Sequence, residues 1–380
     1  MTGSVVKKAN RWYVIIEQRD PQTGARRRKW HSGYRTRREA EAARTDILSR
    51  IQHGTYVDPH RLDVREYLMD SWLPSISSSV KESTLRSYAL NIHRHVLPAL
   101  GGRLLQDLRV PDLNAFYAGL LKVPRASGGG TLSRTTVRYV HTILHKALAD
   151  AVRWNLLAVN PADAATPPRP AARGSAMRVW EPDDVRRFLA AVAGDRLSAA
   201  WLLLASTGLR RGELLGLRWQ DVDLQERRLH IRQALIALGG TSSVTTPKSG
   251  HGRTVALDRA SAEALDRHRR LQVAERLAAG PAWTDTGFVF TQPDGRAVRP
   301  DGLTRRFAGL IRAAGLPTIR LHDVRHTHAT LALRAGVHPK IVSERLGHAT
   351  VSITLDTYSH VLPSLQEQAA ETIARLFATS

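Results

Sequence analysis

Four side chains suited to phosphate chemistry lie between His322 and Tyr358. His322 and Arg325 stand three residues apart, His348 follows a Leu-Gly pair, and Tyr358 comes ten residues after His348. A guanidinium and imidazoles can bind phosphate oxygens and deliver protons to them. A phenol is the only strong nucleophile available, because the chain has no cysteine. A protein that only binds phosphates would not need such a nucleophile. The segment therefore predicts an enzyme that breaks a phosphate ester.

Two further cations lie upstream of this segment. Arg210 follows the Thr207-Gly208-Leu209 turn, and Glu213 is placed to hold its guanidinium. An arginine fork suits two non-bridging phosphate oxygens. Lys248 lies in a basic loop between two β-rich segments, 229–238 and 253–257. Taken singly, Arg210 could be a surface charge and Lys248 part of a solvated turn.

Other interpretations of these residues are weaker. His322, His326 and His328 could form a metal cluster, but Arg325 beside them would repel a divalent ion. The i, i+4 pair His141 and His145 lacks a supporting carboxylate or a second pair. No metal site is expected, and the absence of cysteine excludes disulfides and thiolate ligands. Tyr358 as a core tyrosine would leave the arginines and histidines unexplained.

The charge of the chain favours a polyanionic partner. Lysine and arginine total 56 against 34 acidic residues, a net charge of +22 with a pI near 11.2. Nucleic acid is the leading candidate, since the basic residues extend along the whole chain and no apolar run is long enough to span a membrane. The first ten residues lack the apolar core of a signal peptide, so a cytoplasmic, nucleoid-associated bacterial protein is expected.

The length of 380 residues predicts two or three domains. Residues 1–57 predict a small sheet and a helix: a strand at 12–16, a turn at 20–24, a basic strand at 26–30, a third strand after Gly33, and a helix over 38–51. Four consecutive basic residues give this sheet a surface that could contact DNA, although a solvated basic face is the alternative: Arg26, Arg27, Arg28 and Lys29.

The remaining chain reads as two larger parts joined by a linker. Residues 62–165 are helical, with one apolar stripe through Leu85, Tyr88, Ile92 and Val96 and another over 137–152. Residues 166–175 are proline-rich and basic, as linkers are. In 176–380, Pro182 marks a helix start and helices dominate around the two β-rich segments. The fold class is mainly α with small β elements.

In their order along the chain, these motifs resemble the tyrosine recombinase family, in its phage-integrase branch. The resemblance rests on Thr207–Arg210 with Gly212–Leu214, Lys248, Leu321–Thr327, Leu346–His348 and Leu355–Tyr358. It implies a mixed α/β, mostly α, catalytic domain over 176–380. It also implies an arm-type DNA-binding domain over 1–57, with a three-stranded sheet plus helix, and a helical core-binding domain over 62–165.

The resemblance also implies a role for each matched residue. Tyr358 would attack a DNA phosphodiester and form a 3′-phosphotyrosyl link, while Arg210 and Arg325 clamp the non-bridging oxygens. Lys248 would protonate the departing 5′ oxygen. His322 would manage the tyrosine proton or bind the phosphate, His348 would add a hydrogen bond, and Glu213 would support the arginines. No cofactor is implied, because the covalent link conserves bond energy and the cations replace a metal.

The expected function is that of a site-specific integrase that integrates or excises a mobile element such as a prophage. The implied partners are double-stranded attachment sites, a homotetramer on DNA, and an accessory directionality factor or DNA-bending protein. A helix over 364–377 is expected to pack on a neighbouring subunit. The alternatives are a type IB topoisomerase, which shares the tyrosine chemistry, and a non-catalytic DNA-binding regulator.

Overall fold

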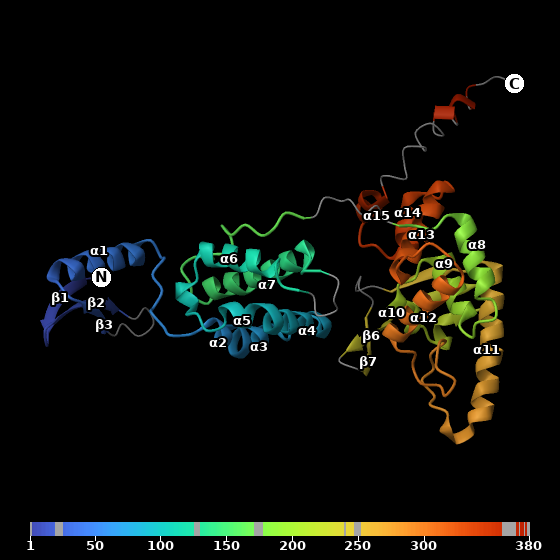
Figure 1. Ribbon diagram of the computed structural model, residues 1–380, viewed down its shortest axis with the longest axis horizontal. Coiled ribbons are helices and arrows are strands. Elements are labelled where there is room, and N and C mark those ends of the chain that lie inside the picture. Colours follow the sequence, from blue (N-terminus) through green and yellow to red (C-terminus); the bar gives the residue numbers. More distant parts are fainter. Residues whose placement is uncertain are drawn as a thin grey trace. The chain divides into compact units, whose positions relative to one another are not determined.

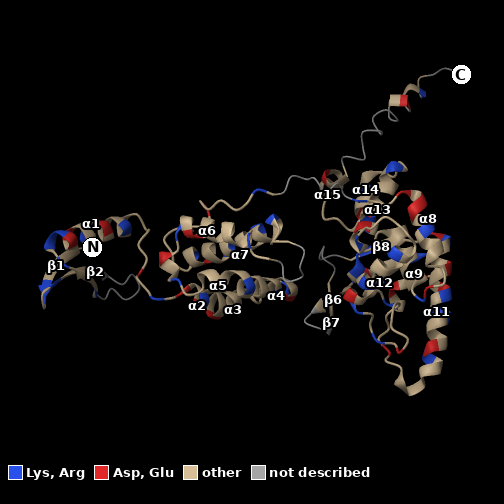
Figure 2. Cartoon of the chain, viewed as in Figure 1, with Lys and Arg blue, Asp and Glu red and all other residues tan. Residues whose placement is uncertain are grey.

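The computed structural model describes residues 2–19, 26–124, 130–170, 178–238, 241–246 and 252–358, with 370–371, 373–375 and 377 near the C-terminus (Figure 1). The chain divides into two compact units, Met1–Gly174 and Ser175–Ser380. Among the described residues, none of the helices is long and apolar enough to cross a membrane. Figure 2 shows that lysine and arginine occur throughout both units and are not gathered in one tail.

The first unit begins with an antiparallel sheet of order β1-β2-β3, formed by β1 (Thr2–Lys8), β2 (Arg11–Arg19) and β3 (Arg26–Tyr34). The predicted three-stranded sheet is confirmed, but one of its strands was misplaced. The unpredicted strand is β1, and Gly33–Tyr34 ends β3 instead of leading into a strand of its own. Ala9 and Asn10, with φ of 43° and 64°, form the two-residue turn between β1 and β2, a conformation that such hairpins require.

Helix α1 (Arg37–Gln52) covers one face of this sheet. It begins at Arg37, one residue before the predicted start. Thr36 caps it: the Thr36 hydroxyl accepts from Glu39 N while the Glu39 carboxylate accepts from Thr36 N. Alternate residues Val14 and Ile16 of β2 are buried against Ala40 and Ile47 of α1. The odd-numbered residues of β2 therefore face the side of the sheet that α1 does not cover.

The helical part of the first unit follows the predicted pattern. A π-helical segment, Tyr67–Trp72, joins α2 (Val64–Glu66) to α3 (Leu73–Ile76). A second one, Ile92–Val96, joins α4 (Glu82–Asn91) to α5 (Leu97–Leu100). Helices α6 (Val110–Leu120) and α7 (Arg134–Arg153) complete it. The predicted stripe of α7 is buried at Val137, Val140, Leu144 and Leu148.

The two histidines of α7 contact different side chains. The Nδ1 atom of His141 lies 2.9 Å from Tyr117 Oη. His145 Nε2 lies 2.8 Å from the carboxylate of Asp163. Each ring is thus engaged by a different residue.

The second unit is built on helices. Its first six are α8 (Pro182–Ala191), α9 (Ser198–Thr207), α10 (Arg211–Leu215), α11 (Arg259–Ala279), α12 (Pro300–Ala313) and α13 (Leu321–Arg334), followed by α14 (Pro339–Leu346) and α15 (Val351–Tyr358). The core is centred on four packed rings, Trp180, Phe188, Trp201 and Phe307. Helix α8 starts at Pro182, as predicted.

Two small sheets lie among these helices. One has the order β4-β5-β8, with β4 (Val222–Asp223), β5 (Arg228–Ile231) and β8 (Arg253–Ala256), and the other pairs β6 (Ala234–Leu238) with β7 (Thr241–Thr245). The β-rich segment 229–238 is thus two strands that pair with different partners. The turn expected around Pro247–Gly250 lies outside the described residues. Of the expected helix at 364–377, the described residues 370, 371, 373–375 and 377 are helical.

Candidate active site

A left-handed turn between α9 and α10 delivers the first arginine. Helix α9 ends at Gly208, whose φ is 64°, and Arg210 immediately precedes α10. A Cβ atom at Gly208 would lie 2.7 Å from Leu346 Cδ2 and 2.8 Å from His328 Cδ2. Glycine is therefore needed both for the backbone conformation and for the close approach of α13 and α14.

Glu213 is the anionic centre of the site. Its Oε1 accepts from Arg210 Nη1 at 2.7 Å, and its two oxygens accept from Arg253 Nη1 and Nη2 at 3.0 and 2.7 Å. Only 1% of the residue is exposed. Burial alone would raise the pKa of this carboxyl, but the hydrogen bonds and charges of Arg253 and Arg210 lower it to about 2. Glu213 is therefore ionised and holds two guanidiniums in place.

Arg253 was not among the residues predicted from the sequence. It is the first residue of β8, and its Nε also donates to the carbonyl of Arg345 at 2.8 Å. Its side chain is 10% exposed. An available signal was its place in the strand directly after the basic loop that carries Lys248.

Arg325 is the most buried of these arginines. It is 4% exposed and donates from Nη1 to Gly208 O at 2.8 Å and from Nη2 to Leu346 O at 2.7 Å. Burial and the nearby Arg210 cation lower the pKa of Arg325 to about 9. The guanidinium therefore still carries its charge at neutral pH, and its remaining N–H groups are available to a ligand.

One turn between α14 and α15 ties the arginines together. Arg210 Nη2 donates to Gly347 O at 3.2 Å, next to the Leu346 carbonyl that accepts from Arg325. A Cβ atom on Gly347, whose φ is 67°, would lie 2.8 Å from Arg253 Nη1. Three guanidiniums thus gather around this turn with Glu213 as the carboxylate that contacts two of them. Such an excess of positive charge favours a bound anion.

Two of the predicted histidines border this cluster. His322 is exposed at the surface, but desolvation by its neighbours and the charges of His326 and Arg325 lower its pKa to about 4. Burial and the Arg325 and Arg210 cations lower the pKa of His348 to about 4. Its Nδ1 lies 2.8 Å from Thr354 Oγ1. Both imidazoles are therefore neutral at pH 7, and each can donate one hydrogen bond.

Tyr358 is the last residue of α15 and is 1% exposed. Its ring packs in a small apolar cluster formed by Ala329, Leu333, Val342 and Leu346. Burial raises the pKa of its phenol to about 12. Its Oη lies 2.8 Å from His326 Nδ1, so the histidine that contacts the tyrosine is His326. The resemblance had implied that His322 would manage the tyrosine proton or bind the phosphate.

The three histidines of α13 do not converge on a metal. His326 contacts Tyr358, and His328 Nδ1 lies 2.9 Å from the carbonyl of Ala205 on α9. His322 is edge-on to His326, with ring centroids 5.0 Å apart. In the part of the chain that the structure describes, no group of three histidine or carboxylate side chains could hold a metal ion. Lys248, the remaining predicted catalytic residue, lies outside the described residues.

The basic run of the N-terminal sheet is divided between its two faces. Arg28 pairs in register with Glu17 and donates from Nε to its carboxylate at 2.6 Å. Lys29 pairs in register with the buried Ile16, on the α1 side, and forms an ion pair with Asp58. The side chains of Arg26 and Arg27 lie outside the described residues.

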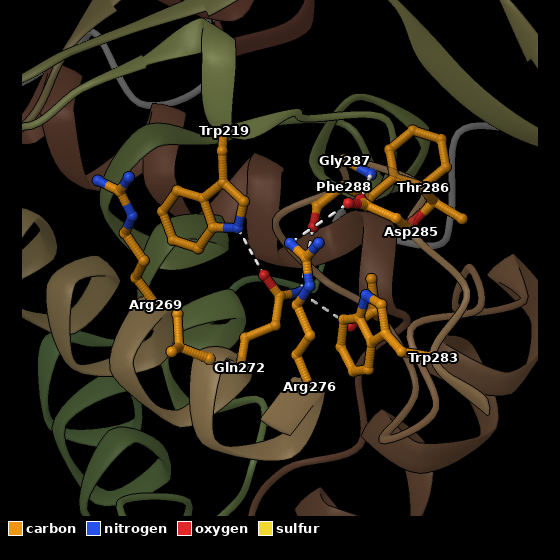
Figure 3. Close-up of a pocket in the computed structure, with 11 residues that line it drawn as sticks. Trp219, Arg269, Gln272, Arg276, Trp283, Asp285, Thr286, Gly287 and Phe288 are labelled. Atoms are coloured by element: carbon orange, nitrogen blue, oxygen red, sulfur yellow. Dashed lines mark hydrogen bonds and ion pairs between the residues drawn. The ribbon is translucent and has the colours of Figure 1, made fainter. Parts of the chain in front are cut away.

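A small cavity elsewhere in the second unit is separate from these residues. It has a volume of about 200 Å³ and lies beside the C-terminal half of α11 (Figure 3). Trp219 Nε1 donates there to Gln272 Oε1 at 2.6 Å, and Arg276 pairs with Asp285 at 3.3 Å. None of the predicted catalytic residues lines it.

Three family models match successive parts of the chain. An arm DNA-binding domain matches residues 4–51, a phage integrase N-terminal SAM-like domain matches 66–121, and the phage integrase family matches 178–364. The matched parts follow one another in the order that the sequence motifs predicted.

Individual relatives support the same assignment. The chain is 29% identical to a XerC-like tyrosine recombinase of Caldanaerobacter subterraneus, over 98% of each chain, and 29% identical to the ICEBs1 integrase of Bacillus subtilis, over 80% of this chain and 81% of that one. A lambda integrase tetramer bound to a Holliday junction has a similar fold, with a TM-score of 0.58, 18% identity, and coverage of 91% of this chain and 92% of that one. The chain belongs to the tyrosine recombinase family, in its phage-integrase branch.

Proposed function

We propose that this site-specific recombinase integrates or excises a mobile element by forming a 3′-phosphotyrosyl link between DNA and Tyr358. The observation that carries the proposal is the gathering of Arg210 and Arg325 at the Leu346–Gly347 turn, in the unit that buries Tyr358. A phosphodiester is an anion whose charge grows on its non-bridging oxygens during attack. Fixed guanidiniums stabilise that charge without reorganising at the moment of reaction.

Each residue of the cluster has a part in this reaction. Arg210 and Arg325 bind the two non-bridging oxygens. Glu213 positions Arg210 by accepting a hydrogen bond from its Nη1. His348 and His322 are neutral and donate hydrogen bonds to the phosphate. Lys248 is the acid that protonates the departing 5′ oxygen.

The bond changes balance without a cofactor. The Tyr358 phenol loses its proton as its oxygen forms a bond to phosphorus, and the 5′ oxygen takes a proton from Lys248 as its own bond to phosphorus breaks. One phosphate ester therefore replaces another, and the number of protons is unchanged. Rejoining reverses the step when a 5′ hydroxyl attacks the phosphotyrosine. Because the ester bond is conserved, neither ATP nor another energy source is required.

The upstream parts of the chain would select and hold the DNA. We assign arm-type sites to residues 1–57 and core sites to residues 62–165, joined through residues 166–175 to the catalytic domain at 176–380. The lambda integrase tetramer supports a homotetramer on DNA for this chain. Action on a bacterial chromosome places the protein in the cytoplasm, where an accessory factor or DNA-bending protein would set direction.

Replacing Arg325 with lysine is expected to reduce DNA cleavage by about 10²-fold or more, while DNA affinity changes only a few-fold. Lysine keeps the charge but cannot donate to Gly208 O, Leu346 O and a phosphate from one planar group. Single-turnover cleavage and a binding titration would measure the two effects. Arg320→Lys is the matched control, because Arg320 is the N-cap of the helix that carries Arg325 and its side chain is 80% exposed. Equal losses of affinity and cleavage would contradict the assigned role.

A recombination assay separates the integrase from its alternatives. Two linear duplexes carrying the attachment sites should exchange ends without ATP or a divalent metal. A type IB topoisomerase would relax supercoiled DNA and leave the partners unexchanged. A non-catalytic regulator would form no covalent adduct at all.

In the N-terminal domain, Arg28→Ala is expected to weaken arm-site binding more than Lys29→Ala. Both side chains form an ion pair, Arg28 with Glu17 and Lys29 with Asp58, but only Arg28 lies on the sheet face that α1 leaves open. Loss of one phosphate contact should lower the slope of log affinity against log salt by about 1. Binding titrations at several salt concentrations would measure this slope, and a larger effect of Lys29→Ala would refute the assignment of the faces.

A further inference from the structure

The hydroxyl of Tyr358 is engaged by a histidine to which the family resemblance gave no role. Tyr358 Oη lies 2.8 Å from His326 Nδ1, a normal hydrogen-bond distance. The two rings come from different elements, α13 and α15, and their centroids are 5.8 Å apart. His322, one turn earlier on α13, meets the edge of His326 and is not the ring bonded to the tyrosine.

The protonation states give this hydrogen bond a direction. The phenol keeps its proton, because burial raises its pKa to about 12. Burial lowers the pKa of His326 below its usual value, and Arg325 and Arg320 lower it further against the opposing effect of Asp323. The other titratable groups that face it are His322, His348 and Tyr358. A neutral His326 with its proton on Nε2 accepts at Nδ1, and the phenol donates.

We propose that His326 is a further catalytic residue, the general base that receives the Tyr358 proton when the tyrosine attacks DNA. The inference rests on the proposed function and adds a proton acceptor to it. As the bond from Oη to phosphorus forms, the O–H bond breaks and the proton moves to Nδ1. The bond from phosphorus to the 5′ oxygen breaks, and that oxygen takes its proton from Lys248. During rejoining, His326 returns the proton to the phenol.

The chemistry of the phenol supports a base of this strength. Before attack, the phenol is too weak an acid to lose its proton to an imidazole. Once the oxygen is bonded to phosphorus, its acidity exceeds that of imidazolium by a wide margin. A base whose pKa lies between these limits and close to the working pH assists the transfer most effectively.

The decisive variant is His326→Asn. The Oδ1 of asparagine can occupy the place of Nδ1 and accept the phenol hydrogen bond, but it cannot take up a proton at neutral pH. Single-turnover cleavage of a nicked attachment-site duplex should slow by about 10²-fold or more, with DNA binding and thermal unfolding close to those of the wild type. The acidic limb that His326 gives to the wild-type pH–rate profile should disappear. His338→Asn is the matched control, since His338 is an exposed N-cap of α14.

A second variant keeps the test independent of how asparagine packs. His326→Ala should lose cleavage to a similar extent and recover part of it when free imidazole is added, which a purely structural role would not produce. Wild-type rates and an unchanged pH profile in His326→Asn would overturn the inference, as would faster cleavage, which would mean that His326 only restrains the tyrosine. A Tyr358→Phe protein that still forms adducts would instead overturn the proposed function itself.

Discussion

Tyr358→Phe is expected to abolish covalent attachment to DNA, a loss of at least about 10⁴-fold in adduct formation, with sequence-specific binding retained. Phenylalanine preserves the packing of the ring, which is 1% exposed, and removes only the hydroxyl that contacts His326. The cost in folding stability should therefore be about 1 kcal/mol, that of one hydrogen bond. Denaturing gels of protein incubated with a nicked attachment site would measure the adduct.

Tyr117→Phe provides a matched control for that experiment. Tyr117 is also buried, and its hydroxyl also lies within hydrogen-bond distance of a histidine, 2.9 Å from His141 Nδ1. It belongs to the helical part of the first unit and should cleave DNA at the wild-type rate. An adduct that persisted in Tyr358→Phe, or disappeared in Tyr117→Phe, would show that the nucleophile had been assigned wrongly.

Glu213→Gln is expected to reduce both stability and cleavage. The folded pKa of Glu213 lies at about 2, below the ordinary value of 4.5. A carboxylate with a depressed pKa stabilises the fold at pH values above 4.5, and this contribution is lost as the pH falls towards 2. The shift corresponds to about 3 kcal/mol. The variant should unfold more easily at neutral pH by about that amount, and its stability should depend less on acid than that of the wild type.

The same substitution should slow cleavage at least about 10-fold, because Arg210 loses the anion that orients it. Denaturant unfolding at neutral and acidic pH, together with single-turnover cleavage, would measure both effects. Glu275→Gln separates the effect on stability from the effect on cleavage. Glu275 pairs with Arg196, and neither residue belongs to the arginine cluster. That control should lose stability and keep its cleavage rate. A Glu213→Gln protein with wild-type stability and unchanged acid sensitivity would contradict the buried ion-pair network.

The candidate site residues were named through the family resemblance, and two of the turns beside them can also be recognised from local sequence. Gly208 and Gly347 end helices in the left-handed conformation, and the residues that follow them are Leu209-Arg210 and His348. Such turns depend on nearby sequence and can be recognised without the fold. Pro182 predicted the start of α8, and helical periodicity predicted the apolar stripe of α7, because both are also local features of the sequence.

Contacts between distant elements could not be predicted in this way. Arg253 begins a strand, and nothing in its neighbours shows that it reaches Glu213, forty residues earlier. His326 meets Tyr358 only because the tertiary fold brings the last residue of α15 to α13. The pairing register likewise decides that Arg28 and Lys29 lie on opposite faces of the sheet. The strand Thr2–Lys8 was missed because its local signal is limited to two valines and the turn at Asn10.

The identity of the trapped linkage tests the central claim most directly. A nicked attachment-site duplex would be cleaved by the full chain, the complex digested, and the peptide–nucleotide adduct identified by mass spectrometry. We predict a phosphodiester between Tyr358 and the 3′ end of the cleaved strand, with a free hydroxyl on the released 5′ end. A link to a 5′ phosphate, or to any residue other than Tyr358, would contradict the proposed mechanism.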